Sequence, residues 1–291
     1  MATPFIIFIF MFSYVPLFGW SLAFFRYQLG LPFRQVFAEN FVGLQYFRWI
    51  FGDEWPAIRR VMTNTLALSG LLILVSPLPM ILAILLNELR SVKFKRTVQT
   101  LTTLPNFVSW VIMFALAFAM FSSDGIINRL LMDWGIIDRR LMVLDNRDIV
   151  WRFQTILSVW KGVGWGAIIY IAAITGIDQE LYEAATVDGA GRFQRVMHIT
   201  LPGVANTYFV LLLLTIGGLL GAAGMTQYLV FSNPLVAPRI ETLDLYTFNR
   251  GIIAQLYSYT IAVGILRSLI SVALLFFANY LSKLVRGHSV F

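Results

Sequence analysis

The sequence contains no cysteine, so disulfide bonds are excluded. Its two histidines, His198 and His288, lie far apart and near no cluster of carboxylates, so a transition-metal site is not expected. There is also no glycine-rich loop that ends in Lys-Ser/Thr, the pattern that holds nucleotide phosphates. If ATP powers this protein, another chain must therefore bind the nucleotide.

Charged residues are scarce as well, at 13% of the chain, about half of the share that is typical of soluble domains. Hydrophobic residues make up 58%, and the mean hydropathy is +0.76. The formal net charge of +7 comes from scattered basic residues, without the concentrated stripe that indicates nucleic-acid binding. No internal repeat or linker divides the chain. The composition therefore indicates a polytopic membrane protein with a single domain.

Six stretches are long and apolar enough to cross a membrane, which takes about 20 helical residues. The first lacks the basic start and the small-residue cleavage site of a signal peptide, so it is interpreted as a true span. The predicted fold is an all-α membrane protein with one transmembrane domain, residues 1–291. The spans are predicted at residues 4–25, 61–87, 98–121, 151–177, 203–230 and 258–284.

The polar segments between these spans indicate the orientation of the chain. The short loop 88–97 carries four basic residues and one acid, so it is expected in the cytoplasm. The longer loops 122–150 and 231–257 are then expected outside, with both termini in the cytoplasm. The segment 26–60 is rich in aromatic residues, which favour the membrane interface, and a short interfacial helix is expected near 41–51.

A polar passage, the elbow (residues 178–202), lies between the fourth and fifth predicted spans. Asp178 can cap a short helix by accepting from free backbone N–H groups. Asp188-Gly189 then ends that helix, because glycine adopts the left-handed conformation at little cost. A second helix is expected from about Ala190. The elbow is thus predicted as two helices joined by a turn whose small residues let another protein approach closely.

Within the elbow, Glu183-Ala184-Ala185 is followed by Gly189 and then by Ile199-Thr200-Leu201-Pro202. This pattern resembles the EAA loop of binding-protein-dependent ABC importer permeases, with all spacings met. The resemblance implies a type I permease fold in which a cytoplasmic coupling loop docks on an ATPase. The alternative is an ordinary amphipathic connector between two spans. The residues expected to dock are Glu183, Ala184, Ala185, Asp188, Gly189, Ala190 and Phe193.

Two basic side chains, Lys161 and Arg267, lie inside predicted spans, where a charge costs about 2.5–3.5 kcal/mol and usually faces a cavity or partner. Each belongs to a polar stripe at helical spacing, and a third stripe suggests a shared water-accessible path. The structural alternatives are that Lys161 bonds to backbone carbonyls and that Arg267 reaches the membrane surface. The stripes are Gln154, Ser158, Lys161 and Trp165; Thr260, Gly264, Arg267 and Ser271; and Thr102, Asn106, Ser109 and Met113.

Trp160 and Trp165 flank a glycine-rich run in the fourth span, and their rings are suited to stacking on the apolar C–H faces of sugars. The alternative is that Gly162, Gly164 and Gly166 permit close helix packing, with the tryptophans as fillers. The candidate residues of a substrate path are Lys161, Trp165, Ser158, Trp160, Arg267 and Asn106.

Motifs outside the elbow carry a second resemblance. They are LNELR at 86–90, FKRTVQT at 94–100, LPNFVSW at 104–110, VWKGVGWG at 159–166, GIDQELYEAA at 176–185 and FSNPLV at 231–236. They resemble the oligosaccharide and polysaccharide-fragment permeases, a branch that includes importers of alginate and pectin-derived fragments. Which sugar is carried, and whether it is acidic, does not follow from them.

This resemblance also implies a set of partners. They are a second homologous permease, two ABC ATPase subunits that hold ATP and Mg, an extracytoplasmic solute-binding protein and an oligosaccharide substrate. The chain is then a multi-pass, non-enzymatic subunit of the bacterial cytoplasmic (inner) membrane, surrounded by lipid, with no cofactor of its own and no nucleic-acid partner.

Three other functions stay open at this point. The first is a permease of the same class that carries another solute, such as a peptide or an amino acid. The second is an intramembrane enzyme, which the absence of paired intramembrane carboxylates, a histidine cluster or a Ser-His pair disfavours. The third is an ion channel, which the absence of a repeated filter sequence disfavours.

Overall fold

The computed structural model describes residues 3–220 and 224–286, and within these ranges it is almost entirely helical. The extended pairing recorded there is an isolated antiparallel bridge between Phe25 and Phe41. Among the described residues, six helices are long and apolar enough to cross a membrane, which confirms the predicted all-α fold with six spans. They are Thr3–Phe24, Trp55–Asn87, Trp110–Asp133, Val150–Thr175, Arg192–Gly217 and Tyr257–Tyr280.

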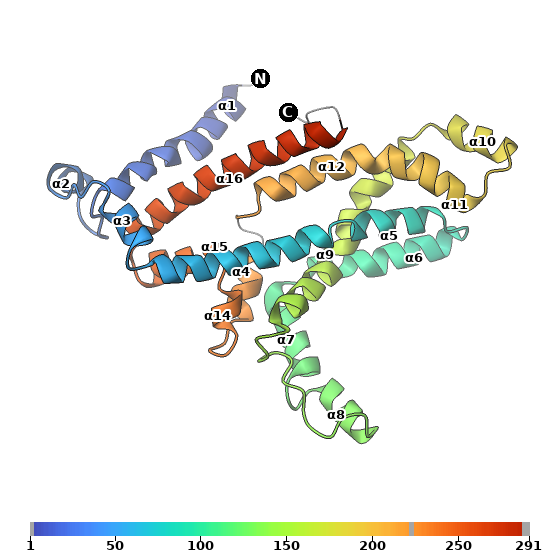
Figure 1. Ribbon diagram of the computed structural model, residues 1–291, viewed down its shortest axis with the longest axis horizontal. Helices are drawn as coiled ribbons and strands as arrows, with labels where there is room; N and C mark the ends of the chain where they lie inside the picture. The colour runs from blue at the N-terminus through green and yellow to red at the C-terminus, as the bar shows by residue number, and fades with distance from the viewer. Residues whose placement is uncertain (1–2, 221–223, 287–291) are drawn as a thin grey trace.

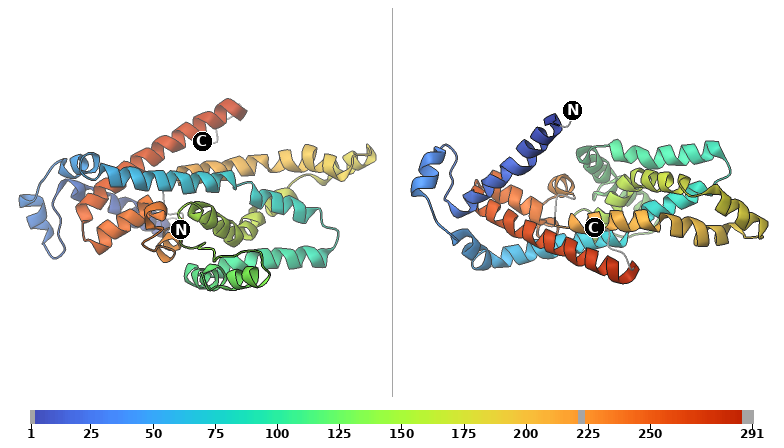
Figure 2. Two further views of the ribbon diagram at one scale, coloured as in Figure 1. Left: turned by 60° about the horizontal axis from the view of Figure 1, so that its bottom comes forward. Right: turned by 90° about the horizontal axis from the view of Figure 1, so that it is seen from above.

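The helices form an elongated arrangement with the elbow at one end and α2 (Phe33–Glu39) and α3 (Gln45–Phe51) at the other (Figure 1). The two further views keep these ends apart (Figure 2). Helix α9 (Val150–Thr175) corresponds to the predicted fourth span at 151–177 and packs against five other α-helices, so it forms the centre of the fold. These neighbours are α4 (Trp55–Leu74), α5 (Leu78–Asn87), α6 (Val92–Thr103), α12 (Leu201–Gly217) and α14 (Ala237–Ile240).

The first span packs on the rest of the chain only near its end. Ala23 is buried in a cluster with Tyr259 and Ala262, whereas apolar side chains such as Phe5 and Phe8 are exposed. Exposed apolar surface of this extent marks contact with lipid or another chain. The span consists of α1 (Thr3–Ile9), the π-helical turn η1 (Phe10–Tyr14) and the 3-10 helix η2 (Val15–Phe24).

The second span starts at Trp55, earlier than the predicted residue 61. Pro56 lies in its first turn, where a missing backbone N–H costs nothing. The span is interrupted at Ser76-Pro77, where the Ser76 hydroxyl is hydrogen-bonded to the Tyr208 hydroxyl at 3.1 Å. Its two parts are α4 (Trp55–Leu74) and α5 (Leu78–Asn87).

The third span differs from the predicted continuous helix at 98–121. Pro105 breaks the helix, because proline lacks a backbone N–H and restricts the residue before it. Ser109 starts the next helix by accepting from the Ile112 N–H at 3.3 Å. The parts are α6 (Val92–Thr103), the 3-10 turn η3 (Leu104–Phe107), α7 (Trp110–Phe121) and α8 (Ile126–Asp133).

Two glycines of α9 allow its neighbours to approach closely. A Cβ atom on Gly164 would lie 2.2 Å from the Thr102 carbonyl oxygen, and one on Gly166 would lie 3.1 Å from Cβ of Pro79. The packing alternative therefore holds for these two positions, whereas Gly162 has open space beside it.

The fifth span also differs from the predicted helix at 203–230. It starts at Arg192, inside the elbow, and ends at Gly217-Gly218, because glycine has a low helix propensity. Residues 221–223 of the predicted span lie outside the described residues. The helices of this region are α10 (Gln179–Val187), α11 (Arg192–Arg195), the π-helical turn η4 (Val196–Thr200), α12 (Leu201–Gly217) and α13 (Met225–Val230).

The C-terminal part contains α16 (Tyr257–Arg286), which covers the predicted sixth span. Before it come three short helices, which are α14 (Ala237–Ile240), α15 (Leu243–Phe248) and the π-helical turn η5 (Asn249–Ile253). Of these, α14 and α15 pack against α4, while η5 packs against α15 and α16 (Figure 1).

Candidate functional site

The elbow folds as the local sequence signals predict. The Asp178 carboxylate caps α10 by accepting from the Glu180 N–H at 3.0 Å. After α10 ends, Gly189 adopts φ +78°, the left-handed conformation that glycine reaches without strain. The second helix begins at Arg192 rather than at Ala190, and the Gly191 N–H donates to the Gln194 side chain at 2.8 Å.

The tip of the elbow is exposed and carries apolar surface. Val187 is 89% exposed and Phe193 is 76% exposed, while Glu183 also faces solvent. A Cβ atom on Gly189 would have no neighbour within 4 Å. A soluble surface can therefore approach this backbone, and the two large apolar side chains favour a partner that covers them.

The elbow is rigidly attached to the fifth span. Arg195 donates to the Thr186 hydroxyl at 3.1 Å, which ties the two elbow helices to each other. The Tyr182 hydroxyl is hydrogen-bonded to the buried Thr200 hydroxyl at 2.9 Å, and Thr200 leads directly into α12. Side-chain hydrogen bonds therefore connect the two elbow helices to each other and to the start of α12.

Lys161 lies in the middle of α9 and faces the break in the third span. Its Nζ atom donates to the carbonyl oxygens of Pro105 at 3.2 Å, Asn106 at 2.7 Å and Val108 at 2.5 Å. It also lies 5.6 Å from the centroid of the Trp110 ring. A broken helix leaves backbone carbonyls without helical partners, and the ammonium group satisfies those of Asn106 and Val108. It is a second donor to the Pro105 carbonyl, which also accepts from the Val108 N–H at 3.2 Å. This geometry corresponds to the structural alternative given above, in which Lys161 bonds to backbone carbonyls.

The rest of the polar stripe on α9 bonds to a residue that the sequence did not single out. Gln227 of α13 donates to the Gln154 side chain at 2.7 Å and to its carbonyl at 2.9 Å, and Ser158 donates to Gln227 at 2.9 Å. Both glutamines are buried, so this network fixes α13 against α9. The sequence signal that could have identified Gln227 was its position as an amide side chain within a mostly apolar run.

The remaining candidate path residues lie apart from one another. Trp165 is half exposed and meets the Phe107 ring edge-on at 5.9 Å. Trp160 is also half exposed, but five residues of helix turn it about 140° away from Trp165. Asn106 contacts Lys161 through its carbonyl oxygen, so Lys161 and Asn106 are brought together.

The stripe predicted for the third span does not lie on one helix face, because the helix is broken. Asn106 belongs to η3, Ser109 caps α7, and Met113 is buried inside α7. Arg267 forms an ion pair with Asp244. Its partner was not apparent from the sequence, since the two residues belong to different helices.

Asp244 belongs to a larger charged cluster, the α15 clasp, formed by three ion pairs. Glu54 pairs with Arg250 at 3.0 Å and accepts from the Tyr246 hydroxyl at 2.9 Å. Burial raises the pKa of the Tyr246 phenol, which keeps that hydroxyl a donor. The three pairs of the clasp are Glu54–Arg250, Arg60–Glu241 and Arg267–Asp244.

No group of three or more His, Asp or Glu side chains within residues 3–220 and 224–286 is placed to hold a metal ion. A small polar cavity of about 390 Å³ does lie between the elbow and the turn that joins α5 to α6. It is lined by Arg90 from that turn and by Arg192 and Arg195 from the elbow. The basic turn and the elbow therefore belong to the same end of the molecule.

Comparison with known proteins gives one family and several relatives. The family described as "Binding-protein-dependent transport system inner membrane component" matches residues 75–287. Protein LplB of Bacillus subtilis (strain 168) is 39% identical over 282 residues, which cover 96% of this chain and 86% of that protein. The "Polygalacturonan/rhamnogalacturonan transport system permease protein YteP" of the same organism is 38% identical, with coverage of 97% and 86%.

A solved structure is similar over the whole chain. It is a bacterial alginate ABC transporter in complex with an alginate pentasaccharide-bound periplasmic protein. The TM-score is 0.86 at 31% identity, and the match covers 100% of this chain and 95% of the other. At this identity the likeness extends beyond the bare helical architecture to much of the sequence.

Proposed function

The chain belongs to the family of binding-protein-dependent transport system inner membrane components, and on this basis we propose that it is the permease subunit of an ATP-driven importer of oligosaccharides. One relative is named for polygalacturonan and rhamnogalacturonan transport, and a similar structure belongs to an alginate importer. These are acidic polysaccharides, so fragments that contain uronate sugars are the proposed cargo. This chain transports and does not catalyse; ATP with Mg binds on separate ATPase subunits.

The proposed complex also contains a second homologous permease. It further contains an extracytoplasmic binding protein, in keeping with the periplasmic protein in the structure of the alginate transporter. The exposed apolar face of the first span offers one surface for lipid or for the second permease. The chain is a multi-pass membrane protein, and we place it in the bacterial cytoplasmic membrane.

The elbow is the proposed docking surface for an ATPase subunit. Its exposed tip, with Val187, Phe193 and a bare Gly189, supports this role. Closure of the ATPases on ATP would push the elbow, and the bonds Tyr182–Thr200 and Arg195–Thr186 pass that motion to α12. Tilting of the spans then alternates between inward-open and outward-open states.

The orientation follows from two features that share one end. The basic turn between α5 and α6 favours the cytoplasm, and the same end carries the elbow. Both termini are proposed to be cytoplasmic, and the α3 end to be extracytoplasmic. Cysteines at Val92 and Asn146 test this in a chain that has none: a membrane-impermeant maleimide added outside should label only Asn146→Cys. Labelling of only Val92→Cys from outside would reverse the orientation and remove the docking role.

The proposed substrate path runs beside α9, past Trp165, Trp160 and Ser158. Lys161 and Asn106 are proposed to shape this path rather than to bind sugar, because the Lys161 ammonium already donates to three carbonyls. Arg267 is similarly engaged with Asp244. The exposed ring of Trp165 is the part of the stripe that a sugar ring can reach, and Trp160 offers a second exposed ring on a different face of α9.

Uptake into proteoliposomes tests the function directly. The purified complex is reconstituted with its ATPases, with ATP on the ATPase side and binding protein plus oligosaccharide on the other. We expect ATP-dependent accumulation of trigalacturonate and none of a tripeptide. The relatedness to YteP and to the alginate importer carries this expectation, and accumulation of the tripeptide alone would contradict it.

A further inference from the structure

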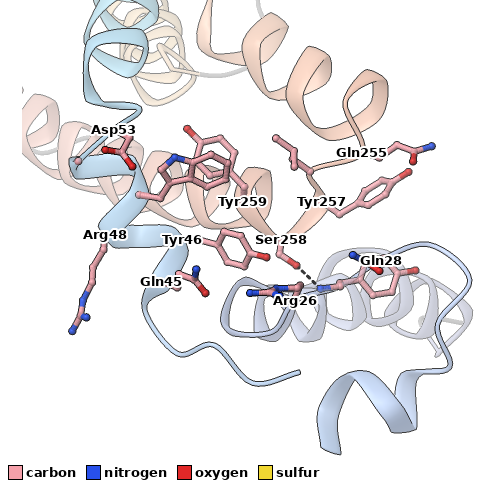
Figure 3. Close-up of a pocket in the computed structure, with 14 residues that line it drawn as sticks. Arg26, Gln28, Gln45, Tyr46, Arg48, Asp53, Gln255, Tyr257, Ser258 and Tyr259 are labelled. Carbon is pink, nitrogen blue, oxygen red and sulfur yellow. Dashed lines mark hydrogen bonds between the residues drawn. The ribbon is translucent and has the colours of Figure 1, made fainter. Parts of the chain in front are cut away.

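A second cavity lies at the end of the molecule opposite the elbow and plays no part in the path described above. It has a volume of about 710 Å³ and opens where residues 26–28, α3 and residues 255–259 meet (Figure 3). This volume falls within the range of cavities that bind small ligands, about 300–1,000 Å³. In the proposed orientation the cavity faces the outside of the cell, where a solute arrives.

The walls of this cavity are aromatic and fixed in place. The Trp49 ring lies 4.8 Å from the Tyr259 ring, and Tyr27 meets Tyr257 edge-on at 5.8 Å. Trp49 and Tyr46 also pack against the buried cluster that contains Tyr259. Because these rings are held by the core, they present preformed apolar faces instead of mobile side chains.

The rim carries polar side chains that are not engaged elsewhere. Across residues 3–220 and 224–286, the side chains of Arg26, Gln28 and Gln255 have no recorded hydrogen bond or ion pair. Gln255 also adopts φ +56°, in the left-handed region, which is strained for a residue with a side chain. Strain of this kind concentrates at functional sites, and here it fixes the backbone that carries an amide at the cavity rim.

We propose that this cavity is a saccharide-binding site that receives a sugar unit of the cargo before it enters the path, with a preference for uronates. Sugar rings have apolar C–H faces that match the aromatic walls, and hydroxyl groups that match the amides of Gln28 and Gln255. The Arg26 guanidinium can bind a carboxylate through two parallel hydrogen bonds. The proposal rests on the oligosaccharide function and names a second place where the sugar binds.

The charges of the rim favour a sugar acid over the phosphate of a lipid. A phosphate site in a chain of this kind is typically a cluster of several cations. Here Arg48 points away from the rings of Tyr46 and Tyr259, and the Asp53 carboxylate also lines the cavity (Figure 3). Arg26 and Arg48 are the two cations that line the cavity, and because Arg48 points away from the rings, Arg26 is the one that a single carboxylate would match.

The test is direct binding to the complete complex without its binding protein. The complex is placed in nanodiscs of zwitterionic lipid and titrated with trigalacturonate or with neutral arabinotriose by calorimetry. Arg26→Gln should weaken trigalacturonate binding about tenfold or more, the loss expected for one charged hydrogen-bonding partner, and change arabinotriose binding little. Gln255→Gly removes the amide while relieving strain, and it should weaken both sugars. Arg34→Gln on α2, an exposed arginine outside the cavity, is the matched control and should change neither.

Each other outcome overturns the site. Wild-type affinity in Arg26→Gln and Gln255→Gly excludes it, and so does the absence of sugar binding by a wild-type complex that still transports. Loss of sugar binding on replacing the zwitterionic lipid with phosphatidylglycerol makes the occupant a lipid. Weaker association with the binding protein at unchanged sugar affinity makes the cavity a protein contact. Failure of the importer function itself is distinguishable, because no saccharide would then accumulate in proteoliposomes of the wild-type complex.

Discussion

The α15 clasp and the elbow lie toward opposite ends of the molecule. They differ in whether their polar and apolar side chains have contacts within the chain. In the clasp, three acids and three arginines pair with one another. In the elbow, no ion pair is recorded for residues 178–202, all of which the structure describes, while Val187 and Phe193 project outward. The charges of the clasp are paired within the chain, whereas the apolar side chains of the elbow would be buried only against another protein.

This difference separates stability from recognition. A charge that is already paired within the chain contributes little to the affinity for another protein, because binding that protein forms no new ion pair. An exposed small-residue turn flanked by apolar side chains gains from burial against another surface. Substitutions in the clasp should therefore change the folding of the chain, whereas substitutions in the elbow should change its assembly and leave folding intact.

The largest expected effect comes from the elbow tip. Glu183→Lys or Gly189→Leu should abolish ATPase association and nearly all ATP-dependent uptake while the permease pair stays inserted. A reversed charge opposes whatever Glu183 contacts, and a leucine at position 189 blocks close approach. Co-purification of the ATPase and vesicle uptake measure the two losses.

Backbone strain needs a control in the Gly189 experiment, because a leucine at φ +78° costs about 1–2 kcal/mol by itself. Gly189→Asn is the control, since asparagine tolerates the left-handed conformation and is smaller. It should retain most of the ATPase association. Normal transport by Glu183→Lys or Gly189→Leu at normal expression would show that the elbow does not dock.

Lys161→Met should have the next largest effect and should act on stability. Methionine keeps much of the volume but removes the ammonium donor from the carbonyls of Asn106 and Val108, while the Pro105 carbonyl keeps the Val108 N–H. We expect a loss of about 2–3 kcal/mol in the free energy of unfolding, with transport per folded complex intact. Thermal denaturation and uptake are measured on the same preparation. Reduced transport at wild-type stability would instead place Lys161 in contact with the sugar.

The smallest of these effects is expected in the clasp. Glu54→Ala leaves Arg250 and the Tyr246 hydroxyl without their acid, and the loss should be about 1–2 kcal/mol because the Arg250 side chain is 37% exposed. Asp138→Ala, an exposed acid without a recorded partner in the described part of the chain, is the control. ATPase co-purification should be unchanged in both variants. If Glu54→Ala lost the ATPase, the clasp would also affect assembly, and the proposed separation between a stabilising clasp and a docking elbow would be wrong.

The elbow was predictable from the sequence because its determinants are local. The Asp178 cap and the Gly189 turn each depend on neighbours within a few residues, and both are confirmed. The start of the second helix was misplaced by two residues, at Ala190 instead of Arg192, which is within the ordinary uncertainty of helix ends.

The breaks in the third and fifth spans were missed because apolar composition dominated the interpretation. Pro105 and Ser109 are a recognisable helix stop and start, and Gly217-Gly218 is a recognisable end. The use of Lys161 depends on the first of these breaks. Once the third span is recognised as broken, an ammonium group on the neighbouring span has carbonyls to bind.

The clasp could not have been predicted from one sequence. Glu54 and Arg250 are 196 positions apart, and Arg60 and Glu241 are 181 apart. Neither local periodicity nor composition connects such residues; only the folding of α15 against α4 and α16 does. The cavity beside α3 could not be predicted for the same reason, since residues 26–53 and residues 255–259, which form its walls, are far apart in the sequence.

The central claim is that the elbow is the end of this chain that another protein covers. A single cysteine at Val187, in a chain that has none, measures it in nanodiscs, where both faces are accessible. We predict rapid maleimide labelling of Val187→Cys in the permease pair alone and protection when the ATPase is bound, with Asp138→Cys labelled equally in both. Equal labelling of Val187→Cys with and without the ATPase would contradict the account.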